Sequence, residues 1–82
     1  MGGLILSVQA YILIQVQTGK AQAIKKELVQ LPQFLRVDRV MGPFDLIALV
    51  EVDNNREIGE LILKEIQSLS GVKRTLTCPV IP

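Results

Sequence analysis

Histidine and tryptophan are absent from the 82 residues, and Cys78 is the only cysteine. A chain without histidine or a cysteine cluster lacks the usual zinc ligands, and one cysteine forms no disulfide within the chain. A nucleophile–base pair would also lack its commonest base. We therefore expect no metal, no cofactor and no catalytic residues. We interpret Cys78, near the end of an apolar segment, as a buried and inert thiol.

A surplus of charge of one sign is also missing. Nine basic and eight acidic residues are mixed along the chain and give a net charge of +1. Lys20, Lys25 and Lys26 are interpreted as the solvated face of a helix. Aromatic residues make up 4% of the chain, so a nucleic-acid surface of basic residues interleaved with aromatics is not predicted. We expect no direct DNA binding.

Long apolar runs are broken in the first 18 residues, "MGGLILSVQAYILIQVQT". Polar side chains at Ser7, Gln9, Gln15 and Gln17 interrupt the apolar residues, and no basic region precedes them. This pattern differs from a signal peptide and from a membrane-spanning helix. We expect no membrane association and a cytoplasmic location.

The apolar content is nevertheless high for so short a chain. The hydrophobic residues make up 49% of the sequence, and a domain of this size buries only about 60–65% of its unfolded surface. We therefore expect a single domain over residues 1–82, with part of the apolar surplus lying at an interface between subunits.

Apolar periodicity divides the chain into six elements. Residues 9–17 alternate with period two, as in a strand, and residues 1–8 are expected to form an N-terminal arm or to extend this strand. Helical spacing follows over residues 21–31, which Pro32 is expected to end. Asn54 and Glu57 have the spacing of a capping box, and Gly71 is expected to cap the end of the second helix. The remaining segments read as strands over residues 35–41, 44–52 and 72–78.

This β-α-β-β-α-β order predicts a ferredoxin-like α+β fold with a four-stranded antiparallel sheet. Both helices then cover one face of the sheet, and the other face is bare unless another molecule covers it. Residues 44–52 are apolar on both faces, which is typical of a strand covered on both sides. The bare face carries either Tyr11, Leu13, Ile47 and Leu49 or the residues that alternate with them. Either choice favours self-association.

One carboxylate, Asp45, directly follows the Gly42-Pro43 turn and precedes the most apolar strand. It is too far from Glu51 for acid–base cooperation within a subunit, since six strand residues span roughly 20 Å. In one interpretation its carboxylate accepts backbone N–H bonds across the turn. In the other it helps to form a small polar pocket at a subunit junction, where turn amides hold a carboxylate and Asp45 holds an ammonium group. A free amino acid carries both groups.

The run "VMGPFDLIALVEVDNNREIGELILKEIQSLSGVKRTLTCPVI", residues 40–81, resembles the C-terminal effector domain of the Lrp/AsnC transcription regulators, also called the RAM domain. The shared features are the Gly-x-x-Asp turn from Gly42 to Asp45, an apolar strand, a helix start after an acidic residue, and "GVKRTLT" before the last strand. The first half, "AYILIQVQTGKAQAIKKELVQLPQFLRVDRV", fits the same pattern. The resemblance covers about residues 9–81.

The resemblance implies homodimers that form through the sheets, as an α/β-barrel-like assembly, and that gather into tetramers or octamers. It also implies that an amino acid binds at the junction between dimers. The residues carried over to this chain are Met41, Gly42, Pro43, Phe44 and Asp45, with Thr75 and Thr77 as hydroxyl donors opposite. Thr75 and Thr77 also fit ordinary strand positions. Pro43 offers no backbone N–H for such a ligand.

Full-length members of that family carry an N-terminal helix-turn-helix, which this sequence lacks. The chain therefore resembles a stand-alone effector domain that senses amino acids, with an indirect effect on transcription through co-assembly with a full-length Lrp/AsnC regulator. One alternative is a structural module whose sheet face only builds a homo-oligomer, with no ligand. Another is a small enzyme with its site between subunits, which the absence of histidine disfavours.

Overall fold

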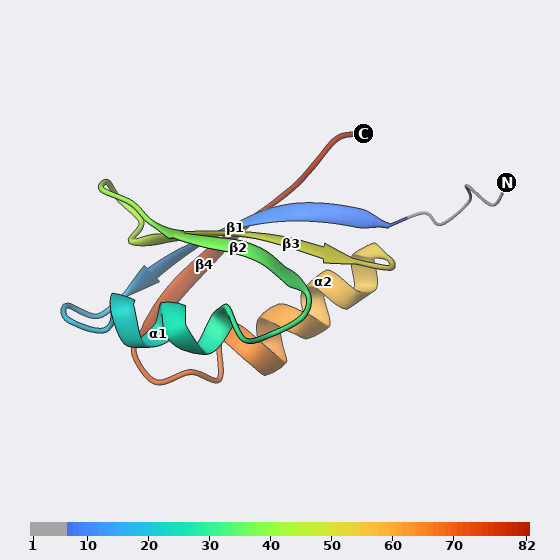
Figure 1. Cartoon of the computed structure of the whole chain (residues 1–82). Helices are drawn as coiled ribbons and strands as arrows, with labels where there is room; N and C mark the ends of the chain where they lie inside the picture. Colours follow the sequence, from blue (N-terminus) through green and yellow to red (C-terminus); the bar gives the residue numbers. More distant parts are fainter. Residues whose placement is uncertain (1–6) are drawn as a thin grey trace, which may run out of the picture.

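The computed structural model describes residues 7–82 and contains the expected order of elements (Figure 1). The order β-α-β-β-α-β confirms the ferredoxin-like α+β fold. Residues 1–6 of the expected N-terminal arm lie outside the described residues, and the first strand begins at Val8. The elements are β1 (Val8–Val16), α1 (Ala21–Leu28), β2 (Phe34–Arg39), β3 (Leu46–Val52), α2 (Asn55–Leu61), the π-helical turn η1 (Ile62–Ile66) and β4 (Val72–Pro79).

The four strands form one antiparallel sheet in the order β2-β3-β1-β4. Both helices lie on the same side of this sheet, below it in Figure 1. β1 and β3 occupy the centre, and every second residue of each strand is buried against the helices. The fully buried side chains there include Ile12, Ile14, Leu46 and Val50. The two-residue period of a strand thus places one half of each central strand in the core.

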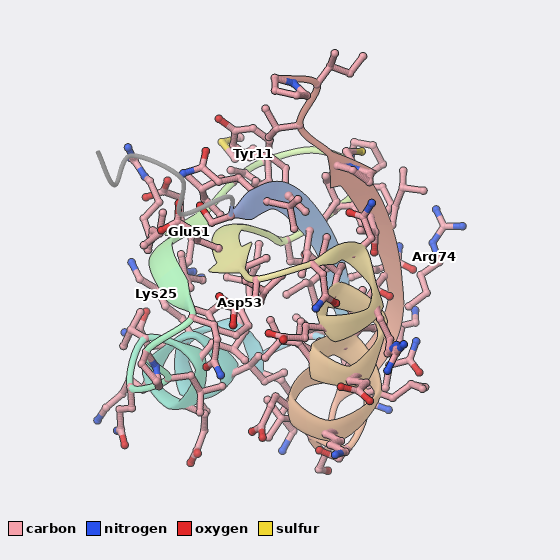
Figure 2. All side chains as sticks on the ribbon, turned by 90° about the vertical axis from the view of Figure 1, so that its right-hand side faces the viewer. Tyr11, Lys25, Glu51, Asp53 and Arg74 are labelled. Atoms are coloured by element: carbon pink, nitrogen blue, oxygen red, sulfur yellow. The ribbon has the colours of Figure 1, made fainter. Side chains whose placement is uncertain are left out.

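The other side of the sheet, called the open face here, carries the alternating residues. Leu13 lies opposite both Ile47 of β3 and Leu76 of β4, and Tyr11 lies opposite Leu49 and Cys78. Because directly opposed residues project to the same face, these six side chains form one apolar band across β3, β1 and β4. Tyr11 stands on the side away from the helices in Figure 2. This result settles which of the two sets of residues is bare.

Cys78 is exposed, so the expectation of a buried thiol was wrong for the single chain. It belongs to the open face through its pairing with Tyr11. A cysteine in an apolar strand is buried only if it lies on the face that the helices cover, and Cys78 lies on the opposite face.

The strand after α1 also differs from its expected pattern. Val37 is buried, but Leu35 is 51% exposed, although the two-residue period of the predicted strand places residues 35 and 37 on one face. The pairing between β2 and β3 shifts register between Phe34 and Arg36. Such a bulge adds one residue and reverses the alternation, so Phe34 takes the core position instead of Leu35.

The helix ends follow local rules with two exceptions. Asn54 caps α2, because its side-chain oxygen accepts a hydrogen bond from the Glu57 N–H at 3.1 Å. The Glu57 carboxylate accepts from the Asp53 N–H and not from the Asn54 N–H of a standard capping box. The second exception is Gly71, which lies beyond η1 and its C-cap Gln67. Its φ of +99° instead serves the turn into β4.

Substitution of Ile12 by valine tests the packing of the core. Ile12 is fully buried between the sheet and the helices, and loss of one methylene there is expected to cost about 0.5–1.5 kcal/mol. The free energy of unfolding is measured by urea denaturation with circular dichroism. Leu63→Ala is the control, because Leu63 is 66% exposed and a surface change is expected to stay within about 0.5 kcal/mol. Equal losses for both variants would contradict the assignment of the core.

Candidate functional site

The segment from Val40 to Asp45, called the 40–45 loop here, connects β2 to β3. The Val40 N–H donates to the Asp45 carbonyl oxygen at 3.0 Å and closes the loop. Gly42 has a φ of +142°, a conformation that favours glycine because it has no Cβ. The Met41 side chain between them is fully exposed. The loop projects away from the helices, toward the open face (Figure 1).

The Asp45 carboxylate holds the loop to the end of β1. Its Oδ2 accepts a hydrogen bond from the Val16 N–H at 2.8 Å, while the Asp45 N–H donates to the Ile14 carbonyl oxygen at 2.9 Å. The regular pairing of β1 with β3 ends at Ile14 and Leu46, so the Val16 N–H has no main-chain acceptor on that side. The expected backbone bond is therefore present, but its donor lies in β1 and not across the Gly42-Pro43 turn.

Two further side chains, which sequence reasoning did not single out, fasten the loop over the open face. Gln15 Nε2 donates to the Pro43 carbonyl oxygen at 3.2 Å. The guanidinium carbon of Arg74 lies 5.1 Å from the centroid of the Phe44 ring. Gln15 and Arg74 are directly opposed in the β1–β4 pairing. Strand alternation marks Gln15 as an open-face residue in the sequence, whereas the Arg74–Phe44 contact depends on how the loop folds.

The two predicted threonines lie on the other side of the sheet. Thr75 is opposite Ile14 and Thr77 is opposite Ile12, and both isoleucines are buried on the helix side. Within one chain, the predicted site therefore separates into the 40–45 loop on the open side and two half-buried hydroxyl residues on the helix side. A site that uses both sets needs a second chain.

Two hollows in the described surface lie away from these predicted residues. A groove of about 230 Å³ runs beside α2 and η1 and is lined by Gln33, Val52, Glu57, Glu60, Leu61, Lys64 and Glu65. A hollow of about 300 Å³ at the start of β1 is lined by Ser7, Val8, Gln9, Glu51, Val80 and Pro82. Neither includes a residue of the 40–45 loop.

The charged groups around the open face are few. Arg36 and Asp38 of β2 form an ion pair with 2.8 Å between Nε and Oδ2. The hydrogen bond from Arg36 to Asp38, together with the negative charge of Asp38, raises the pKa of Arg36 above its usual value. Residues 7–82 contain no cluster of three or more metal-ligating side chains. No helix in the same range is long and apolar enough to cross a membrane.

These features define a class of protein: a ferredoxin-like domain with helices on one face of its sheet, an apolar open face, and a loop that carries a carboxylate at the rim of that face. The family described as the Lrp/AsnC ligand binding domain matches residues 9–81. The chain belongs to this family. It is a family of regulatory, non-enzymatic domains that is linked to transcription regulation.

Known relatives of two lengths are similar to this chain. The HTH-type transcriptional regulator FL11 of Pyrococcus furiosus is 29% identical over 75 residues, which cover 92% of this chain and 49% of the regulator. The chain thus spans about half the length of the curated relatives it matches. The solved structure of TTHA0845 from Thermus thermophilus has a TM-score of 0.87 at 35% identity and covers 92% of this chain and 94% of its own. The FFRP-DM1 structure has a TM-score of 0.86 at 28% identity and covers 90% and 99%.

Substitution of Asp45 by alanine tests its structural role. Removing the carboxylate leaves the half-buried Val16 N–H without its acceptor, which is expected to cost about 1–3 kcal/mol of unfolding free energy. Asp45→Asn is the matched variant, since its side-chain oxygen still accepts this bond, and it is expected to keep most of the stability. Urea denaturation measures both variants. An alanine variant as stable as the wild type would show that the bond does not hold the loop.

Proposed function

We propose that this protein is an oligomeric amino-acid-binding domain that acts in the cytoplasm as a sensor or modulator of transcription regulation. It pairs through its open sheet face and binds the effector where the 40–45 loop of one chain meets a second chain. It influences transcription by co-assembly with full-length Lrp/AsnC regulators. The apolar open face beside the 40–45 loop is the single observation that carries the proposal.

The open face supports the oligomeric part of the proposal. Tyr11 is 45% exposed and Leu76 is 51% exposed in the single chain, and both lie in the continuous apolar band with Leu13 and Cys78. Burying a few hundred Å² of this band gains several kcal/mol, at roughly 25 cal/mol per Å². A second copy brings an identical band, and a twofold axis then covers both.

The chemistry of the loop supports the ligand part. Oδ2 of Asp45 is held by the Val16 N–H, whereas Oδ1 makes no hydrogen bond among the described residues. An anionic oxygen in a fixed orientation is a suitable acceptor for an ammonium group. Thr75 and Thr77 of a chain in a neighbouring dimer are proposed to add hydroxyl groups, since within one chain the threonines lie on the helix side of the sheet and the loop lies on the open side.

Substitution of Ile47 by glutamate tests self-association. Ile47 is opposite Leu13 at the centre of the open face, where a buried charge without a partner is strongly unfavourable. The wild type is expected to sediment as a dimer or larger species of the 9.1 kDa chain, and the variant as a monomer with an unchanged circular dichroism spectrum. Analytical ultracentrifugation at micromolar concentration makes the measurement.

The control for this experiment is Leu63→Glu, since Leu63 is exposed on the helix layer. This variant is expected to sediment like the wild type. A monomeric wild type at micromolar concentration would overturn the oligomeric part of the proposal.

A screen of the twenty amino acids by thermal shift and calorimetry tests ligand binding. At least one amino acid is expected to bind saturably and to raise the melting temperature. Asp45→Asn removes the negative charge and keeps the Val16 bond, so it is expected to weaken binding at least about tenfold while the oligomer persists. Arg56→Ala serves as the control and is expected to bind normally, because Arg56 is exposed in α2, which follows the end of β3 opposite to the loop. A stable oligomer that binds none of the twenty would favour the purely structural module.

A further inference from the structure

Arg74 occupies an unusual place for a surface arginine. Its guanidinium lies over the Phe44 ring of the 40–45 loop, with 5.1 Å from the guanidinium carbon to the ring centroid. Figure 2 shows this side chain projecting outward from β4. A cation–π contact does not use up the hydrogen-bonding capacity of the guanidinium, so its N–H groups stay available for other partners.

Those N–H groups have no acceptor among residues 7–82. The one ion pair of this range joins Arg36 to Asp38, and no side-chain hydrogen bond involves Arg74. The second open-face arginine, Arg36, thus has its carboxylate within the same chain, whereas Arg74 does not. Phe44 restrains the guanidinium of Arg74, so less side-chain freedom remains to be lost when an anion binds.

The chemical fit is to a carboxylate. A guanidinium presents paired N–H donors in a fixed plane and binds both oxygens of a carboxylate at once. Phe44, the ring that Arg74 contacts, directly precedes Asp45 in the chain. The Oδ1 atom of Asp45 has no hydrogen-bond partner among the described residues. The guanidinium of Arg74 therefore lies against Phe44, and the next residue of the chain carries an anion, at the rim of the open face. This arrangement matches the two charged groups of a free amino acid.

We propose that Arg74 binds the α-carboxylate of the amino-acid effector, with Phe44 as the platform that fixes its guanidinium. The inference rests on the proposed function and adds a specificity rule: ligands without a free carboxylate bind poorly. In this proposal Arg74, and not the backbone amides of the turn, is the main hydrogen-bond donor to the ligand carboxylate. This agrees with Pro43, which has no backbone N–H to donate.

The test compares an amino acid with its own α-carboxamide, which has the same side chain and ammonium group but no negative charge. The probe is the amino acid that binds the wild type most tightly in the screen of twenty. Isothermal calorimetry gives the dissociation constants of both compounds for the wild type, Arg74→Gln, Arg74→Lys and Arg36→Gln. The measured quantity is the ratio of the carboxamide constant to the amino-acid constant.

The wild-type ratio is expected to be at least about ten, the size of a charge-assisted hydrogen bond expressed as affinity. In Arg74→Gln the ratio is expected to fall close to one, and in Arg74→Lys to an intermediate value, since lysine keeps the charge without the planar fork. Arg36→Gln is the matched control, because Arg36 is also an open-face arginine, and it is expected to keep the wild-type ratio. Circular dichroism checks that each variant is folded.

Two results would overturn the inference and leave the proposed function in place. One is a wild-type ratio near one, which means that the carboxylate is not recognised. The other is an Arg74→Gln variant that weakens both compounds equally, because Arg74 would then only position the 40–45 loop through Phe44. If no amino acid binds the wild type, the proposed function itself fails and this inference fails with it.

Discussion

Two helices cover one face of a four-stranded sheet, and this constraint governs the rest of the molecule. The central strand β3 is apolar on both faces except at Glu51, and β1 adds Tyr11 and Leu13 to the face away from the helices. The helices therefore bury one set of apolar side chains and leave the other set bare. In the part of the chain that the structure describes, α1 and the continuous α2–η1 segment lie on the same side of the sheet, so neither covers the other side. The bare apolar band is therefore a consequence of the fold, and a second molecule that packs on it would cover it.

The 40–45 loop lies next to the face that the helices leave bare. It rises at the rim of the bare face, where two chains would meet, and it is held there by Asp45, Gln15 and Arg74. The structural and functional interpretations of Asp45 are compatible, because the two carboxylate oxygens have different environments. Oδ2 accepts the Val16 N–H just beyond the end of the β1–β3 pairing, and Oδ1 makes no hydrogen bond among the described residues. Ordinary strand geometry thus places an anionic group at the rim of the open face.

The sequence pattern was sufficient for the order of the elements and for the two faces of β1 and β3, since these depend on local periodicity. It did not decide which face the helices cover, and the expectation for Cys78 was wrong for that reason. The register shift that exposes Leu35 depends on pairing with β3, which local pattern does not encode. The Arg74–Phe44 contact joins residues thirty positions apart through the shape of a loop. Contacts of this kind can be identified only in the folded structure, not from the sequence pattern.

Cys78 offers a direct probe of whether a second copy covers the open face, because it is exposed in the single chain and is the only thiol in the sequence. The measurement is its rate of reaction with a thiol reagent over a range of protein concentrations, with the denatured chain as the reference for full exposure. The account predicts a rate that falls well below the reference at high concentration and rises toward it on dilution. A fast rate that is the same at every concentration would show that the open face stays bare.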